Sequence, residues 1–135
     1  MATYIHNATL VDGNGGDPLN DAAVIIEGNK IAAVGPMHEV PKPSEATVID
    51  AQGSWILPGL IDTHVHILLE GVDIARDLQT PFSMRFYNAV NYLRRTLDAG
   101  ITSVRDAGGA DAGTKLAVES GVIVGPRLQI SVSVL

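Results

Sequence analysis

The stretch Pro58-Gly59-Leu60-Ile61-Asp62-Thr63-His64-Val65-His66 decides how the rest of this sequence is interpreted. A Pro-Gly turn leads into an apolar run that ends in two histidines separated by one residue. Side chains two positions apart on a strand point to the same side, so we expect Asp62, His64 and His66 to share one face and Val65 to lie on the other. Two imidazoles on one face of a strand end are a candidate pair of ligands for a divalent metal ion.

Asp62 has two interpretations at this point. Its carboxylate is expected either to hydrogen-bond an imidazole N–H and fix the tautomer of that ring, or to serve as a turn or packing residue. Two histidines do not complete a metal site, and such pairs also occur by chance. Their surroundings favour metal binding, because the pair falls at the C-terminal end of a strand, where α/β barrels keep their active sites.

Downstream of Pro58 the sequence alternates between strand and helix patterns, which predicts an α/β fold with a parallel sheet. One apolar helix stripe is formed by Phe86, Ala89, Val90, Leu93 and Leu97. Gly100 stands where a glycine ends that helix. Further strands are expected over Ile101–Arg105 and Leu128–Leu135, with a short helix over Thr114–Glu119, closed by Gly121, between them.

The strand count suggests an incomplete barrel. Leu60–His66 is the first of about three parallel strands, whereas a closed (β/α)8 TIM barrel takes about 250 residues. We therefore expect residues 58–135 to be the first βα units of an incomplete barrel, in a chain that is truncated, nicked or partly represented.

The preceding part, residues 1–57, is predicted to be all-β and to form part of a small β-sandwich domain. Glu27-Gly28-Asn29-Lys30 predicts a tight hairpin, because Gly and Asn tolerate positive φ. The expected strands are Thr3–His6, Thr9–Val11, Ala22–Glu27, Lys30–Val34, Thr47–Asp50 and Ser54–Leu57.

Composition excludes several classes of protein. Of the 135 residues, 46% are hydrophobic and 18% are charged, which is typical of a globular chain. The formal charge of −6, without a run of Lys or Arg, argues against nucleic-acid binding. Neither a signal peptide nor an apolar run of about 18 residues is apparent, so no membrane association is expected. The absence of cysteine excludes thiolate metal ligands and suits a cytoplasmic location.

Extended to Trp55, the same stretch, Trp55–His66, resembles the N-terminal signature of the amidohydrolase superfamily. The preceding residues agree with that resemblance, since Ala8–Gly13, Val24–Gly35 and Ala51–Gly53 look like the small β-sandwich of the superfamily. Farther along, Gly100–Asp106 and Gly125–Leu128 are similar to the branch that contains imidazolonepropionase-like enzymes and metal-dependent Xaa-Pro or Xaa-Arg dipeptidases.

The resemblance implies a hydrolase in which metal-activated water attacks the carbonyl carbon of dipeptide-like or cyclic amides and the C–N bond breaks. His64 and His66 would bind the more buried of one or two divalent ions, Zn²⁺ being the expected metal. A carboxylated lysine, two further histidines and an aspartate would come from later strands. The general base is expected in the missing region, so no catalytic residue is assigned within this chain.

Several other polar residues are placed less specifically. Arg105 and Asp106 are expected near the barrel mouth, either at the site or as an ion pair or loop cap outside catalysis. Glu70 and Asp73 are expected in a solvated loop, and the two remaining histidines, His6 and His38, at the surface.

Two other functions stay open. The chain could be a non-catalytic fragment that needs a complementary chain or the missing C-terminal region, or an independent β-sandwich binding module. The expected partners are a small-molecule amide or dipeptide and the remainder of the barrel, and assembly into a homo-oligomer stays open.

Overall fold

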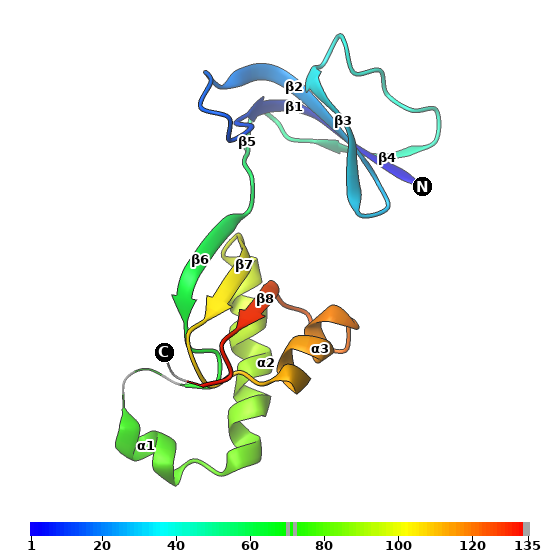
Figure 1. The fold of residues 1–135 in the computed structure, drawn as a ribbon. Coiled ribbons are helices and arrows are strands. Elements are labelled where there is room, and N and C mark those ends of the chain that lie inside the picture. Colours follow the sequence, from blue (N-terminus) through cyan, green and yellow to red (C-terminus); the bar gives the residue numbers. More distant parts are fainter. Residues whose placement is uncertain (70, 72, 134–135) are drawn as a thin grey trace. The chain divides into compact units, whose positions relative to one another are not determined.

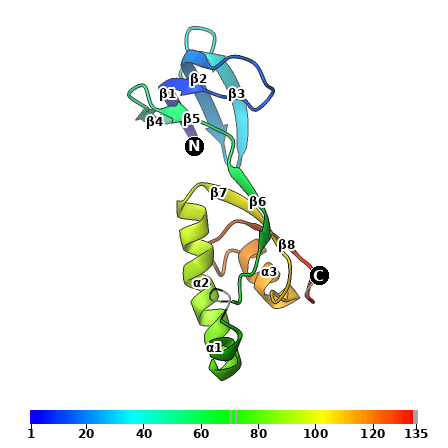
Figure 2. The ribbon, with the colours of Figure 1, turned by 90° about the vertical axis from the view of Figure 1, so that its left-hand side faces the viewer.

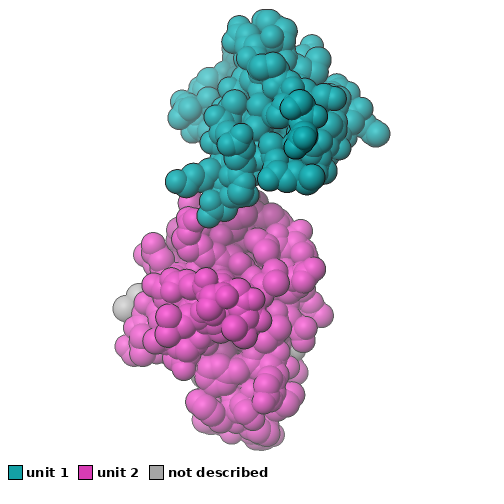
Figure 3. Space-filling model, turned by 90° about the vertical axis from the view of Figure 1, so that its right-hand side faces the viewer, with its two compact units in different colours: residues 1–58 teal, residues 59–135 magenta. Residues whose placement is uncertain are grey.

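The computed structural model describes residues 1–69, 71 and 73–133. The chain divides into two compact units, Met1–Pro58 (unit 1) and Gly59–Leu135 (unit 2), which Figure 3 shows in teal and magenta. Among the described residues, unit 1 contains strands and unit 2 alternates strands with helices. No helix in the described part of the chain is long and apolar enough to cross a membrane.

Unit 1 is built on one mixed sheet whose main path runs β3-β2-β1-β4 (Figure 1). β1 runs antiparallel to β2 and parallel to β4 and to the short β5. All described strands of unit 1 belong to this sheet, so the second layer of the expected β-sandwich is not among them. The strands are β1 (Ala2–Leu10), β2 (Leu19–Glu27), β3 (Lys30–Pro36), β4 (Ala46–Asp50) and β5 (Trp55–Ile56).

The predicted hairpin is confirmed at the β2–β3 connection. Glu27 pairs with Lys30, which leaves Gly28 and Asn29 as a two-residue loop. Gly28 adopts a positive φ of 61°, a conformation that glycine reaches without a steric cost.

The first strand differs from its prediction. Two short strands, Thr3–His6 and Thr9–Val11, were expected, but β1 is continuous from Ala2 to Leu10. Asn7 has a φ of 57°, and the pairing with β2 shifts register between Ile5 and Ala8. Asparagine tolerates this left-handed conformation, so the strand bends through an irregularity and does not stop there.

The core of unit 1 lies on both faces of β2. Ala23 and Ile25 pack with Tyr4 and Val40, whereas Ala22 and Val24 pack with Leu10. Because neighbouring residues of a strand project to opposite faces, these two clusters lie on opposite sides of the sheet. β2 is therefore a central strand buried on both sides.

Unit 2 contains a parallel sheet in the order β6-β7-β8, with helices in its connections (Figure 2). Val104 and Leu128 pair across β7 and β8 and share one core with Ala89, Leu93 and the half-buried Val118. Since those three residues come from α2 and α3, both helices cover the same face of the sheet. The elements are β6 (Leu60–Val65), α1 (Ile74–Gln79), α2 (Phe82–Asp98), β7 (Ile101–Asp106), α3 (Ala112–Glu119) and β8 (Arg127–Ile130).

Two glycines of unit 2 allow close packing. A Cβ on Gly59 would lie 2.1 Å from Oγ1 of Thr102, and a Cβ on Gly125 would lie 2.9 Å from Cβ of Leu93. Neither contact is tolerated, so glycine at these positions sets how closely β6 approaches β7 and the segment before β8 approaches α2.

Helix α2 confirms the predicted apolar stripe for most of its members. Ala89 and Leu93 are buried and Phe86 packs against them, but Val90 lies at the exposed edge of the stripe. Gly100 follows the helix with a φ of 85°, as expected of a terminating glycine.

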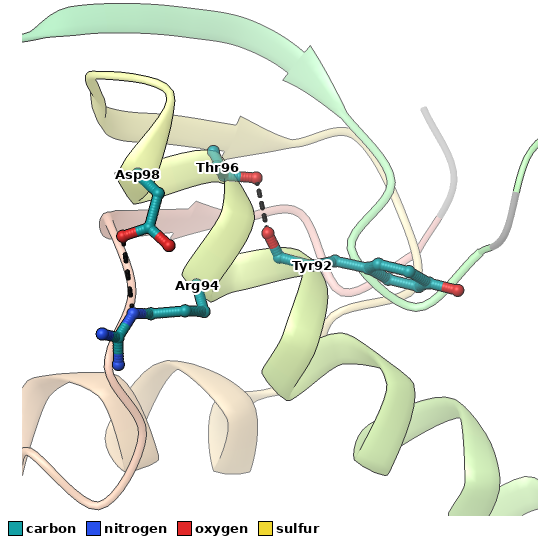
Figure 4. Close-up of polar contacts among 4 residues, drawn as sticks. All are labelled: Tyr92, Arg94, Thr96 and Asp98. Carbon is teal, nitrogen blue, oxygen red and sulfur yellow. Dashed lines mark hydrogen bonds and ion pairs between the residues drawn. The ribbon is translucent and has the colours of Figure 1, made fainter.

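The C-terminal half of α2 also carries polar contacts (Figure 4). Arg94 pairs with Asp98 over 3.4 Å, and the hydroxyl of Thr96 donates to the carbonyl of Tyr92 at 2.8 Å. Both side chains of the ion pair are mostly exposed, so this pair adds little to stability.

One further prediction about unit 2 was wrong, and one helix was not predicted. Asp73 is exposed and precedes the helix, as expected of a loop residue, and it caps the short helix α1 by accepting from the N–H of Arg76 at 3.0 Å. The last strand was expected to reach Leu135, but β8 ends at Ile130. Val132 has a φ of 69° and is 62% exposed, so it does not continue the apolar face. Residues 134 and 135 lie outside the described residues.

Candidate metal centre

The two histidines lie at the C-terminal end of β6. His64 is inside the strand, and His66 is the first residue after the strand ends at Val65. Their ring centres are 5.3 Å apart and their planes cross at 81°. His64 is exposed and His66 is half-buried. The structure therefore brings together the two residues that the sequence predicted as ligands.

The face expected for Asp62 needs a correction, because β6 is irregular. Asp62 pairs with Val104, and Val65 pairs with Asp106. Val65 lies three residues after Asp62 on β6, whereas Asp106 lies only two residues after Val104 on β7. Paired residues project from the same face of a sheet, and residues two apart on β7 share a face. Asp62 and Val65 therefore lie on one face, although strict alternation would separate them. The extra residue is a bulge that re-aims the side chains between them.

The imidazole of His66 is held by a backbone carbonyl. Its Nδ1 lies 3.0 Å from the carbonyl oxygen of Gly108, in the segment after β7. A carbonyl oxygen accepts hydrogen bonds and cannot donate them, so Nδ1 carries the proton. The lone pair is then on Nε2, which leaves that nitrogen available to bind a metal ion.

The hydrogen bond of Asp62 runs to the main chain. Oδ1 of this half-buried carboxylate accepts from the backbone N–H of His64 at 3.0 Å. The contact spans two residues and fixes the backbone at the bulge next to the histidine. Asp62 thus contacts the main chain of His64, a turn-type contact that fits the second of the two interpretations given to it, a turn or packing residue.

Asp106 is the most enclosed polar residue of the site, with no exposed surface. Its Oδ2 accepts from Ile67 N–H at 2.7 Å, and its Oδ1 accepts from Gly108 and Ala110 N–H at 2.9 and 3.1 Å. Hydrogen bonds of this charge-assisted kind contribute about 1.5–3 kcal/mol each. Of the two interpretations given to Asp106, the structure supports the loop cap. The following Gly108-Gly109 pair was the available sequence signal, because glycines let a backbone fold round a carboxylate.

Arg105 lies on a different part of the sheet. Its Nε donates to the carbonyl of Thr63 at 2.7 Å, and the residue is exposed. The side chain lines a hollow formed by residues of β6, β7 and β8. The other lining residues are Ile61, Thr63, Ser103, Val104, Arg127 and Gln129.

The two remaining histidines belong to unit 1. His6 stacks on Tyr4 with ring centres 5.4 Å apart, and His38 pairs with Glu39 at 3.5 Å in exposed surroundings. The described residues contain no group of three or more His, Cys, Asp or Glu side chains that could hold an ion. Glu70 lies outside the described residues.

Comparisons with known proteins show which chains this one is similar to. Residues 55–135 match the sequence model described as the amidohydrolase family. The chain is 33% identical over 108 residues to an enamidase from Eubacterium barkeri, covering 78% of this chain and 25% of the enamidase. It is 42% identical over 67 residues to an imidazolonepropionase from Idiomarina loihiensis, covering 50% of this chain and 16% of that enzyme.

A solved structure matches almost the whole chain. The crystal structure of a prolidase complexed with N-methylphosphonate-L-proline superposes with a TM-score of 0.85 at 34% identity. The match covers 98% of this chain and 32% of the prolidase chain. The chain thus spans a third or less of the length of these three proteins.

Proposed function

This chain belongs to the amidohydrolase family, and we propose that it supplies two ligands, His64 and His66, to the metal centre of a hydrolase that cleaves C–N bonds. The observation that carries the proposal is the orientation of His66. Its Nδ1 is committed to the carbonyl of Gly108, which leaves Nε2 free for an ion.

The pair of rings fits a divalent ion such as zinc. Imidazole nitrogens bind zinc at about 2.0–2.1 Å, so two rings on one tetrahedral ion have centres roughly 5 Å apart. The ring centres of His64 and His66 are 5.3 Å apart. The donor set also suits zinc, although imidazole binds other first-row ions, and either one or two ions are compatible with the proposal.

The chemistry follows from the ion and its supports. With His64 and His66 among its ligands, a divalent ion would polarise the scissile carbonyl and lower the pKa of a water molecule toward about 7. The residues of this chain hold the ligands in place for that purpose. The carbonyl of Gly108 fixes the tautomer of His66, and Asp62 fixes the backbone at His64.

The rest of the centre is proposed to come from polypeptide outside this chain. Two imidazoles leave a tetrahedral ion short of ligands, and the described residues offer no third group beside them. The general base that takes a proton from the attacking water would also lie there. Accordingly, unit 2 would form the first strands of a (β/α)8 barrel and unit 1 part of a β-sandwich. The parallel order of β6, β7 and β8, with helices on one face, supports the barrel.

The proposed substrates are cyclic amides and dipeptide-like amides. The relatives support this class, since they include an imidazolonepropionase and a prolidase complexed with an analogue containing proline. The choice between the two groups would depend on loops beyond this chain, because barrel specificity lies in the βα loops.

The test uses the protein that contains this chain at its full length. Metal content and hydrolysis of a panel of Xaa-Pro dipeptides and cyclic amides are measured for the wild type, His64→Ala and His66→Ala. His38→Ala is the matched control, because this histidine lies in unit 1 and its side chain is 80% exposed. We expect metal and activity to fall in the first two variants alone. Unchanged metal stoichiometry and full activity in both would reject the proposal.

The alternative is a non-catalytic piece that acts through a complementary chain, and a measurement of complex formation on the same protein separates it from the first proposal. β6 and β8 are the outer strands of their sheet, and an outer strand offers backbone groups for pairing. A wild-type protein without metal or turnover that forms a stable complex with a second chain would favour that alternative.

A further inference from the structure

We infer that Asp106 is the positioning residue for His66, because its buried carboxylate holds both backbone segments on which the orientation of that imidazole depends. The inference rests on the proposed function, in which His66 binds the metal. It assigns to Asp106 a role beyond that of a loop cap, acting through the backbone and not through contact with the ion.

The first segment is the main chain that carries His66. Ile67, the next residue, donates its N–H to Oδ2 of Asp106 at 2.7 Å. The side chain of Ile67 is 4% exposed and belongs to the core of unit 2. The backbone immediately after His66 is therefore fixed on both sides, by the carboxylate and by the core.

The second segment presents the carbonyl that His66 uses. Gly108 and Ala110 donate their N–H groups to Oδ1 of Asp106 at 2.9 and 3.1 Å. The carbonyl oxygen of Gly108 lies 3.0 Å from Nδ1 of His66. The carboxylate thus holds the N–H groups on either side of the peptide whose carbonyl fixes the imidazole tautomer.

Together these contacts close a ring of interactions. The path leads from His66 to Ile67 through the chain, from Ile67 to Asp106 and from Asp106 to Gly108 by hydrogen bonds, and from Gly108 back to His66. Asp106 lies at the end of β7, the middle strand of the sheet, and its backbone carbonyl accepts from the N–H of Ser131 at 3.2 Å. Asp106 is therefore anchored independently of the histidine that it supports.

The chemistry of the site requires a carboxylate in particular. Three N–H donors converge on two oxygens that are completely buried. An asparagine of the same shape would keep one oxygen and would place an NH₂ group against at least one N–H donor. A substitution of this kind should loosen one segment or the other without changing the volume of the side chain.

Zinc binding by the full-length protein tests the inference. Asp106→Asn is compared with Asp111→Asn, the same chemical change at an aspartate that caps α3 and contacts Thr114. Leu93→Ala serves as a stability control, because it removes core packing without touching the carboxylate. We expect the zinc dissociation constant to rise about 10–100-fold in Asp106→Asn and to stay within about twofold in both controls.

A second readout reports on the imidazole directly. In protein labelled with ¹⁵N-histidine and stripped of metal, His66 should carry its proton on Nδ1 in the wild type and in both controls. In Asp106→Asn the ring should show mixed tautomers. A purely structural role would lower the unfolding temperature and leave this signal unchanged, as Leu93→Ala is expected to do.

The outcomes separate the two proposals. If His66→Ala loses metal while Asp106→Asn keeps wild-type zinc affinity and an unchanged His66 tautomer, the inference is rejected and the proposed function stands. If His66→Ala keeps its metal, the proposed function is rejected. Should Asp106→Asn fail to fold, the wild-type spectrum decides: a His66 ring protonated on Nε2 with a bare Nδ1 would overturn the inference.

Discussion

The backbone N–H of Ile67 donates to Oδ2 of Asp106 over 2.7 Å, joining the residue after His66 to the end of the next strand. The two residues are 39 positions apart in the sequence. This contact links the fold to the candidate site, because the pairing of β6 with β7 is what brings the carboxylate to the histidine segment. Changes that disturb this pairing should therefore affect both stability and metal binding.

Gly59→Ala tests how closely β6 must approach β7. The added Cβ would lie 2.1 Å from Oγ1 and 2.7 Å from Cβ of Thr102, so a rotamer change alone cannot relieve the clash. We expect a loss of about 1–3 kcal/mol in the free energy of unfolding, measured by urea denaturation. Gly16→Ala is the control, because nothing lies within 4 Å of its added methyl group. Equal stability of the two variants would contradict the close approach.

Leu93→Ala tests the core between α2 and the sheet. Leu93 has no exposed surface and packs with the residues around Val104 and Leu128. Its truncation should lower the free energy of unfolding by about 2–5 kcal/mol. Leu116→Ala makes the same change at a residue that is 61% exposed and should have a much smaller effect. A comparable loss in both variants would show that the buried face of α2 has been assigned incorrectly.

Asp111 should make the stability of α3 depend on pH. Hydrogen bonds from the backbone N–H of Thr114 and then from its hydroxyl hold the pKa of this carboxyl below its usual range. A lowered folded-state pKa means that the contribution is complete above the usual aspartate pKa and is lost as pH falls through the lowered value. The measurement is an NMR titration of the Asp111 carboxyl carbon.

The corresponding variant, Asp111→Ala, removes the N-cap and should cost about 1 kcal/mol at neutral pH. The difference between wild type and variant should shrink as the pH approaches the folded-state pKa of Asp111. A carboxyl that titrates in the usual range, together with a difference that does not change with pH, would show that the cap is not formed in solution.

How much of this molecule could be predicted from its sequence depends on the range of the interactions involved. The β2–β3 hairpin, the apolar stripe of α2 and the position of Gly100 follow from local patterns, and the structure contains all three. The superfamily resemblance is confirmed by the match over residues 55–135.

The features that sequence reasoning missed depend on long-range pairing. The bulge in β6 is set by its register with β7, about 40 residues away, and no local pattern between Asp62 and Val65 indicates it. The burial of Asp106 likewise needs backbone donors from two separate loops. Strand β8 was overestimated because alternation continues through Val132, although that residue turns away with a positive φ.

Two substitutions of Asp62 should show whether zinc binding depends on its hydrogen bond to the backbone or on its negative charge. Its Oδ1 accepts from the N–H of His64, and an asparagine oxygen can do the same. We expect Asp62→Ala to weaken zinc binding by about tenfold or more in the full-length protein, and Asp62→Asn to keep most of the affinity. The measurement is zinc competition with a chromophoric chelator. Equal losses in both variants would indicate that the negative charge matters, and not the backbone hydrogen bond.

The most direct test of the central claim is an anomalous diffraction map, recorded at the zinc edge, from crystals of the zinc-loaded full-length protein. We expect a peak at about 2.0–2.1 Å from Nε2 of His66 that is also bound by His64, with Nδ1 of His66 still hydrogen-bonded to the carbonyl of Gly108. A zinc peak that contacts neither histidine, or one bound through Nδ1 of His66, would contradict it.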